Sequence, residues 1–403
     1  MHARPSRFVI WSIVVIMVIF IWNMSAKTKV KNKNVVLTTM AVDQSRRKVV
    51  EPPSNKTLDV PPRPLEHVIY RVNRLPPDDL TDSGLAPLTK WTQREIFRRM
   101  NPANCSSAKF LLTESNVGSG IGSSLHVMGT HLAYAIENNL VLVWGPNSCR
   151  HMPGEHKNCR HFFMEITGCA EEYIAKNTIG SVEGQAHRTL VPDVFRRAIA
   201  PFMNNEREIL YWWRAQSIGY IGRMNSNTMA TVLNMRRDTS LHFYSGGVLP
   251  FPLPVGTVSA HIRHGDKHTE MKLVDTVVFY EAAKKMARLQ PLSFGGKNYF
   301  VTSDSQIAID SSQGLLSSDW KIAYSKVIRE RNGFVMSEWE LSSNVTTYNH
   351  LLQLLMALEA DAWVGTRGSN WNRLIDELRC IWVDKCMHVY TEVGDIGDGD
   401  YSW

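Results

Sequence analysis

The sequence comprises 403 residues, 44% of them hydrophobic, which suits about two domains with well-packed cores. Its formal net charge of +7 arises within the first 60 residues, so the remainder of the chain is neutral overall. Because nucleic-acid-binding domains carry a basic excess on their folded part, this charge pattern argues against a nucleic-acid partner.

An uncharged apolar run occupies residues 8–26 and follows a short basic tail at residues 1–7. The run is about long enough to cross a thin membrane of the secretory pathway. Met24 stands where signal peptidase prefers a small residue, which favours a retained signal anchor over a cleaved signal peptide. Four lysines follow the run, so the positive-inside rule alone does not place the C-terminal side in the lumen.

Residues 27–84 are rich in proline and show little apolar periodicity, which predicts an extended stem. Two other features favour a luminal, single-pass type II protein of the Golgi or ER membrane. The even number of cysteines, without the spacing of a zinc site, predicts disulfides, and Cys380 and Cys386 are close enough for a short-loop bridge. Sequons for N-glycosylation follow the stem start at Asn55, Asn104 and Asn344.

The first part of the folded sequence predicts alternating strands and helices. The expected elements are a helix over 85–100, a strand over 110–112, a glycine turn over 118–122, a helix over 125–136 and a strand over 141–144. Gly120 and Gly122 would let the backbone approach a phosphate at the start of a helix. The GxGxG spacing lacks the third glycine of a dinucleotide fingerprint, so a purely structural turn is an equal alternative.

Residues 149–169 predict a loop, in which three histidines lie among the cysteines without the spacing of a standard metal site. We therefore expect no metal. Residues 206–236 are helical in character, and prolines at 250, 252 and 254 predict a hinge-like boundary. The predicted organisation is an N-terminal α/β domain over 85–254 and a C-terminal domain over 255–403.

Residues 258–262 alternate small or apolar side chains with polar ones, which predicts a strand with one buried face. His261 and Arg263 would share its other face. Polar groups at the carboxyl end of such a strand lie where open α/β sheets bind ligands. There Arg263 can bind a phosphate through two hydrogen bonds, Lys267 can add a charge and Glu270 can act as a base. The stretch therefore predicts transfer of a group from an anionic leaving group.

Further strand, turn and helix units follow this stretch. Helices are expected over 277–289, 348–359 and 371–379, and strands over 298–304 and 361–364. Their alternation predicts a parallel sheet covered on both faces. The polar strand ends, with Asp304 after one strand and Ser369 and Asn370 after another, are expected to converge on a nucleotide site.

Three motifs occur in order, at residues 261–267 (HIRHGDK), 299–304 (YFVTSD) and 360–369 (ADAWVGTRGS), the last followed by Arg373. Together with residues 101–109, the glycine loop and residues 213–216 (WRAQ), they resemble the α-1,6-fucosyltransferase superfamily. That superfamily includes the animal core fucosyltransferase and the rhizobial nodulation fucosyltransferase. The resemblance implies a GT-B-like pair of α/β domains, a Rossmann-like C-terminal domain, GDP-fucose as donor, inversion, and no metal or other cofactor.

The resemblance also implies roles for individual residues. Arg263 would neutralise the departing β-phosphate, and Glu270 would accept the proton of the attacking hydroxyl on the glycan acceptor. The expected donor-binding residues are His261, His264, Asp266, Lys267, Tyr280, Asp304, Ser369, Asn370, Gly120 and Gly122.

Some positions depart from the animal core enzyme. His264 stands in place of an arginine, Ser305 in place of an acid, and Gln353 in place of the aspartate that contacts guanine. The alternatives are therefore a transferase for another nucleotide sugar and a non-catalytic protein that binds glycan or nucleotide. Residues 263–265 (RHG) also match histidine phosphatases, a distant third because His350 and His388 lack the acidic neighbour that family needs. The acceptor stays open, with the core of N-glycans on glycoproteins as one candidate.

Overall fold

The computed structural model describes residues 87–115, 120–150, 156–184, 187–203, 205–241, 250–265, 272–315, 319–325 and 344–394. The predicted tail, membrane span and stem lie outside these residues, and so do Asp266, Lys267 and Glu270. Within the described ranges, no helix is both long enough and apolar enough to cross a membrane.

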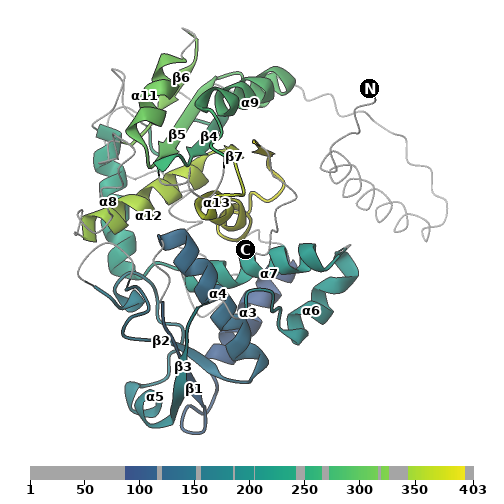
Figure 1. Ribbon diagram of the computed structural model, residues 1–403, viewed down its shortest axis with the longest axis vertical. Coiled ribbons are helices and arrows are strands. Elements are labelled where there is room, and N and C mark those ends of the chain that lie inside the picture. Colours follow the sequence, from purple (N-terminus) through teal and green to yellow (C-terminus); the bar gives the residue numbers. More distant parts are fainter. Residues whose placement is uncertain are drawn as a thin grey trace, which may run out of the picture. The chain divides into compact units, whose positions relative to one another are not determined.

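The first sheet has three parallel strands in the order β2-β1-β3. They are β1 (Phe110–Thr113), β2 (Val141–Trp144) and β3 (Thr178–Val182). One face packs against α3 (Pro87–Met100) and α4 (Ile121–Glu137), and α7 (Glu206–Ile221) lies on these helices (Figure 1). The other face packs on α5 (Glu171–Asn177) and on the disulfide Cys105–Cys169.

Further helical elements lie between and after these strands. They are the 3-10 helices η3 (Cys159–His161) and η4 (Ala200–Phe202) and the helices α6 (Asp193–Ile199) and α8 (Ser226–Leu241). The helical stretch predicted over 206–236 is therefore two helices, α7 and α8. The second disulfide of this region, Cys149–Cys159, closes the loop before η3.

The second sheet has five parallel strands in the order β6-β5-β4-β7-β8. They are β4 (Thr257–Ile262), β5 (Asn298–Ser303), β6 (Lys321–Ala323), β7 (Ala362–Gly365) and β8 (Tyr390–Glu392). The chain runs outward from β4 to β6, and then returns to the other side of β4 to form β7 and β8. This is the doubly wound arrangement of nucleotide-binding α/β folds, whose switch point lies between β4 and β7.

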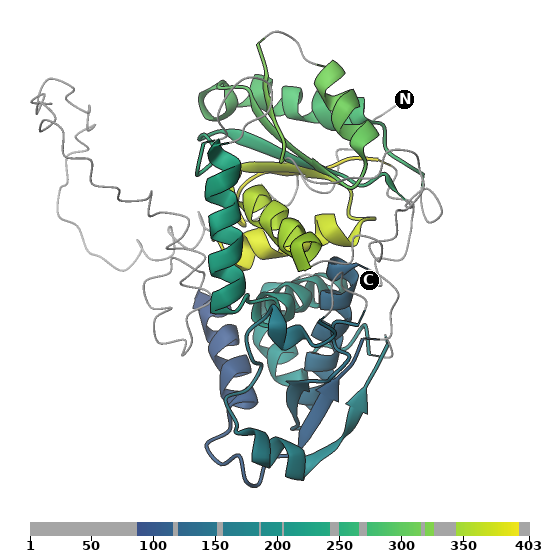
Figure 2. The same ribbon diagram turned by 90° about the vertical axis from the view of Figure 1, so that its left-hand side faces the viewer.

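Helices cover both faces of this sheet (Figure 2). On one face lie α9 (Thr276–Leu289), the short α10 (Pro291–Phe294) and α11 (Gln306–Gly314). On the other lie α12 (Asn344–Glu359) and α13 (Asn370–Ile381). The predicted α/β fold with a covered parallel sheet is confirmed.

Strand β4 differs from the prediction, because all six of its residues are buried. Val258 and Ala260 pack toward α9 and α11, as the alternating pattern indicates. The opposite face is also covered, and His261 lies beside Trp371 of α13 with 7% of its surface exposed. The expectation of only one buried face was wrong, because α13 covers the polar face too, where His261 hydrogen bonds with Thr302.

The helices of the two sheets share one hydrophobic core. Helix α13 packs against α7 and α4, and α12 packs against α8. Arg236 of α8 and Glu359 of α12 form a buried ion pair, which also binds the peptide groups of Pro250 and Leu253. The proline segment predicted as a hinge is therefore held by this ion pair at the carbonyl of Pro250 and at the N–H of Leu253. The domain boundary near residue 254 stays a prediction.

Candidate functional site

The candidate site lies at the carboxyl ends of β4 and β7, on either side of the switch point. Strand β4 continues into Arg263 and His264, and β7 continues through a turn into Ser369 and Asn370. The side chain of Asn372 donates a hydrogen bond of 3.1 Å to the carbonyl of His261, which ties the first turn of α13 to the end of β4. Ligands of open α/β sheets bind at such a junction.

Arg263 and Asp304 meet directly at this edge of the sheet. Nη1 of Arg263 forms an ion pair with Asp304, which follows β5, and the two side chains are 27% and 29% exposed. The other carboxylate oxygen of Asp304 accepts the backbone N–H of His264 at 3.0 Å. A Cβ atom on Gly265 would collide with the side-chain ends of both Arg263 and Asp304, so any other residue here would displace this ion pair. The structure thus brings these predicted site residues together in a partly open position.

His264 faces a different direction from Arg263. Its Nε2 donates a hydrogen bond of 2.7 Å to the carbonyl of Val274, in the segment that leads into α9. Ser305, the other departure close by, donates its backbone N–H to the hydroxyl of Ser303. The imidazole of His264 therefore anchors a neighbouring segment, which an arginine at this position would not do in the same way.

His261 and Tyr280 lie in the interior. Nδ1 of His261 lies 2.9 Å from the hydroxyl of Thr302, on the face covered by α13. Tyr280 of α9 is 3% exposed and packs with Tyr299 and Trp320 on the opposite face of the sheet. The structure therefore places Tyr280 in the core, away from the edge that carries Arg263.

A second feature reaches the site from the first sheet, where the N-terminus of α4 meets the N-terminus of α13. A Cβ on Gly122 would lie 3.3 Å from the backbone of Asn370, and the amide of Asn370 donates a hydrogen bond to the hydroxyl of Ser123. Gly120 caps α4 and Ser369 caps α13, in both cases without a side-chain hydrogen bond. Gly122, predicted in a turn, lies instead in the first turn of α4.

These two helix ends are a favourable place for an anion. Each helix dipole is positive at its N-terminus, and the first N–H groups of a helix have no partner within it. Where two such ends adjoin, phosphate oxygens gain donors from both.

Buried cations lie just behind the helix ends. Arg373 is 6% exposed, its Nη2 donates to the side chain of Asn370 at 2.6 Å, and its Nε has no hydrogen bond within the described part of the chain. Burial lowers the pKa of Arg373 and lowers that of Arg214 to about 10, against the attraction of Glu377. Glu377 is also 3.0 Å from His126. An anion beside Asn370 would offset the cost of burying these cations.

Sequence reasoning gave no role to Ser123, Arg214 or Arg373. Arg214 and Arg373 belong to the segments that resemble the fucosyltransferase family, so the motifs contained a signal for them. Ser123 had none, because its contact with Asn370 joins residues 247 positions apart.

No protein-family model matches the sequence, and no curated protein matches it. Among solved structures, the chain is similar to the NodZ α-1,6-fucosyltransferase soaked with GDP-fucose, with 16% identity and a TM-score of 0.36 over 68% of this chain and 93% of that one. It is also similar to POFUT1 in complex with GDP-fucose, with 12% identity and a TM-score of 0.38 over 73% of this chain and 100% of that one. A third similar structure is a mutant of FUT1 from Arabidopsis thaliana in complex with GDP, with 10% identity and a TM-score of 0.42 over 73% of this chain and 78% of that one.

Proposed function

We propose that this chain is an inverting glycosyltransferase that moves fucose from GDP-fucose to a hydroxyl of a glycan acceptor. The single observation that carries the proposal is the arrangement at the carboxyl edge of a doubly wound sheet. Arg263 and Asp304 meet there, α13 begins beside the end of β4, and the N-terminus of α4 adjoins that of α13. The order of the three family-like motifs, which supply most of these residues, selects fucose and GDP within that chemistry.

The same proposal includes the finer features that the resemblance implies. The chain is a GT-B-like, single-pass type II protein of the Golgi or ER, anchored by residues 8–26, with its catalytic part in the lumen. The N-glycan core of glycoproteins is one candidate acceptor.

The residues present suit a reaction in which protein groups receive the charge of the leaving group. The acceptor oxygen bonds to the anomeric carbon as the bond from that carbon to the β-phosphate oxygen breaks. The negative charge left on GDP falls to Arg263 and to the N–H groups at the start of α13, with Arg373 behind them. With these cations in place, the reaction requires no divalent metal ion.

The proton of the acceptor hydroxyl needs a base on the opposite side of the sugar. Glu270 is the candidate, seven residues beyond Arg263 in a segment outside the described residues. Attack from that side inverts the anomeric centre.

The test is an assay of the purified protein with GDP-fucose, GDP-mannose and UDP-sugars, a mixed glycan array and EDTA. Fucose transfer in EDTA is the expected result. Transfer of another sugar would show that GDP-fucose is not the donor. Loss of activity in EDTA that Mg²⁺ or Mn²⁺ restores would contradict the metal-free mechanism.

Arg263→Ala provides the matching variant, and the exposed Arg288→Ala of α9 is its control. We expect Arg263→Ala to lower kcat by more than about a hundredfold, the usual cost of losing a donor to a developing oxyanion. Near-normal turnover in this variant would remove Arg263 from the mechanism.

One observation favours a non-catalytic second candidate, a protein that binds GDP or glycan without turnover. The ring of His264 is bound to the carbonyl of Val274, so it does not offer the second guanidinium that the animal core enzyme has at this position. Calorimetric titration with GDP, together with the absence of product for every donor, would identify this case.

A further inference from the structure

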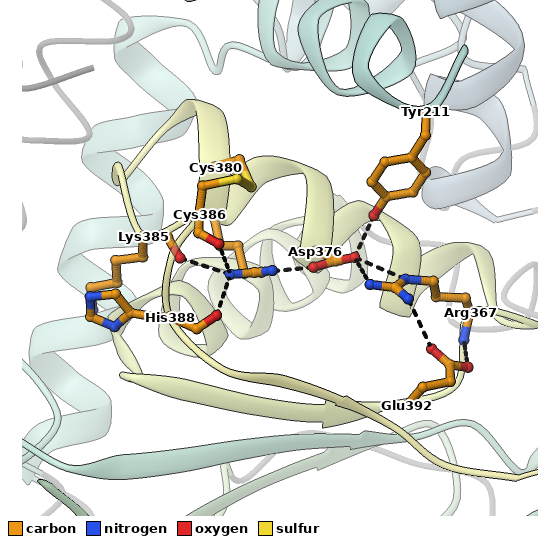
Figure 3. Close-up of polar contacts among 9 residues, drawn as sticks. Tyr211, Arg367, Asp376, Cys380, Lys385, Cys386, His388 and Glu392 are labelled. Carbon is orange, nitrogen blue, oxygen red and sulfur yellow. Dashed lines mark hydrogen bonds and ion pairs between the residues drawn. A yellow bond between two sulfur atoms is a disulfide. The ribbon is translucent and has the colours of Figure 1, made fainter. Parts of the chain in front are cut away.

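Arg367 occupies the turn between β7 and α13, where an arginine is well placed to bind a donor phosphate. Its side chain is only 12% exposed and points away from the turn (Figure 3). Nε and Nη2 of Arg367 lie 3.0 and 2.7 Å from one carboxylate oxygen of Asp376, which is on α13. The guanidinium therefore points from the turn toward α13, the helix that follows it.

A second carboxylate fixes the backbone of the same turn. The N–H of Arg367 donates to Glu392 of β8 at 2.6 Å, and Nη1 of Arg367 lies 3.7 Å from the other oxygen of Glu392. Arg367 is thus held at its backbone and at its side chain, between β8 and α13.

The carboxylate of Asp376 also reaches the first sheet's helices. The hydroxyl of Tyr211 on α7 donates to the same oxygen of Asp376 that binds Arg367 (Figure 3). Asp376 is 2% exposed, so these hydrogen bonds are shielded from water. The turn after β7 is thereby connected to α7 through one buried carboxylate.

The far side of Asp376 is anchored by a disulfide loop. Nε of Arg379 binds the second oxygen of Asp376 at 2.7 Å, and Nη1 donates to three carbonyls at 2.7 to 3.1 Å. Those carbonyls belong to Lys385 and Cys386, in the loop closed by the Cys380–Cys386 disulfide, and to His388 just after it (Figure 3). Asp376 therefore has donors on both oxygens and from three elements.

We propose that Arg367 is a positioning residue which, through Asp376 and Tyr211, holds the N-terminus of α13 against α7 and so sets the affinity for the nucleotide-sugar donor without touching it. This inference rests on the proposed function for the identity of the ligand. The position of the turn itself does not depend on that identity.

The charges explain why Arg367 stays in this place. Burial alone would raise the pKa of Asp376, but Arg379 and Arg367 hold it below its ordinary value, so the carboxylate remains ionised. If Arg367 moved out to a phosphate, the buried carboxylate of Asp376 would lose one of its two arginine partners, which is unfavourable.

The experiment uses the full chain with Arg367→Met, Arg367→Lys, Tyr211→Phe and the double variant Arg367→Met/Tyr211→Phe. Four quantities are measured: the KM and the kcat with GDP-fucose, the Kd of GDP, and the amide exchange rates of residues 366–371. The exposed Arg288→Met is the control for loss of a positive charge.

We expect Arg367→Met to raise the donor KM and the Kd of GDP about tenfold or more, with a smaller change in kcat and faster exchange over residues 366–371. Arg367→Lys should restore only part of the affinity, because a single ammonium group does not supply the two N–H donors that Arg367 directs at Asp376. Tyr211→Phe should also raise the Kd of GDP and the exchange rates of residues 366–371. In the double variant, the Kd should rise by less than the product of the two single-variant factors.

Two outcomes would overturn the inference. If Arg367→Met weakened GDP binding while exchange at residues 366–371 stayed as in the wild type, Arg367 would be a direct ligand. If Tyr211→Phe left the Kd of GDP and the exchange rates of residues 366–371 unchanged, Tyr211 would not connect the turn to α7.

The proposed function fails separately. A wild-type protein that neither binds GDP nor transfers fucose would refute that function and the donor part of this inference. In that case the exchange rates still decide whether Arg367 and Tyr211 hold the turn.

Discussion

Arg263 and Asp304 form an ion pair that contributes little to folding, because both side chains are more than a quarter exposed. Their value lies in position. Asp304 holds the guanidinium at the end of β4 and also binds the N–H of His264. A change in this pair should therefore alter activity much more than stability.

Asp304→Asn tests this at the level of one residue, because the amide oxygen can still accept the N–H of His264 while the charge is lost. We expect turnover to fall about tenfold as Arg263 loses its orientation, and the melting temperature to change by only about one or two degrees. Steady-state kinetics and a thermal melt give both values.

The control for Asp304→Asn is Asp310→Asn, at an exposed position on α11. Unchanged kinetics in Asp304→Asn would show that Arg263 needs no orienting partner.

The stability of the folded protein depends on pH through the carboxyl group of Glu392. Burial raises the pKa of Glu392 from 4.5 to about 7, although Arg367 opposes the shift. The folded protein therefore keeps a proton that the unfolded chain releases. The bound proton contributes fully to the free energy of unfolding below pH 4.5. Its contribution, about 3 kcal/mol in total, is lost as the pH rises from 4.5 to about 7.

Glu392→Gln should remove this decline, because glutamine stays neutral and still accepts the N–H of Arg367. We expect the variant to match the wild type near pH 4 and to have the larger free energy of unfolding at pH 8. Urea unfolding at both pH values measures the difference, with the exposed Glu172→Gln as control. Parallel pH profiles for wild type and Glu392→Gln would contradict this assignment.

Among the elements, α8 and α12 are joined by the ion pair of Arg236 and Glu359, whose side chains are only 2% and 1% exposed. Burial raises the pKa of Glu359, and Arg236 opposes that shift. Glu359 also accepts the N–H of Leu253, so the pair fixes the segment that enters β4. Removing one partner leaves the other charged and buried.

We expect Arg236→Met to reduce the free energy of unfolding by about 3–5 kcal/mol, and Glu359→Gln by a similar amount. The double variant Arg236→Met/Glu359→Leu should cost clearly less than the sum, since no charge is left unpaired. Chemical denaturation of the three variants gives the coupling. An additive double variant would mean that the pair does not act as a unit.

The helices and strands that were predicted well from the sequence are those with a clear local pattern of apolar residues. Strand β2 and helix α9 match their predicted ranges within one residue, because each is an apolar run or stripe between turn residues. Strand β3 was missed because most of its residues are exposed, and β6 and β8 because each has only three residues. Short edge strands carry little periodicity.

Of the candidate site, the residues that follow strands could be predicted from the sequence, and the contacts between helices could not. Arg263 and Asp304 follow strands that pair, so their meeting could be inferred from strand ends alone. The contact of Ser123 with Asn370, and that of Tyr211 with the Asp376 carboxylate that Arg367 binds, join residues 247 and 165 positions apart. Both contacts depend on helices packing across a long sequence separation. No local pattern encodes that packing. The burial of Tyr280 was missed for a related reason, since a tyrosine at a strand-facing helix position fits both a core and a cleft.

At the scale of the whole molecule, three disulfides pair all six cysteines, and the predicted Cys380–Cys386 bridge is confirmed. Cys105–Cys169 spans the largest separation, 64 residues, and joins two segments that pack on one face of the first sheet. Such bonds persist in oxidising compartments, so they accord with the proposed luminal orientation.

N-glycosylation tests that orientation, and the structure distinguishes two of the sequons. Asn104 lies in an exposed turn before β1, where its side chain binds Ser106 locally. Asn344 is the first residue of α12, and its side-chain oxygen is buried. An oligosaccharide needs an accessible asparagine, so we expect Asn104 to carry more glycan than Asn344.

The measurement is the shift in gel mobility on glycosidase treatment of the full chain expressed in animal cells, compared with Asn104→Gln and Asn344→Gln. Asn104→Gln should abolish most of the shift that arises outside the stem. Pro291→Asn supplies a positive control, because it creates an exposed sequon with Ser293 far from the candidate site. A chain that gains no glycan at Asn104, at Asn344 or at the Pro291→Asn site has its folded part outside the lumen, and the type II orientation would then be wrong.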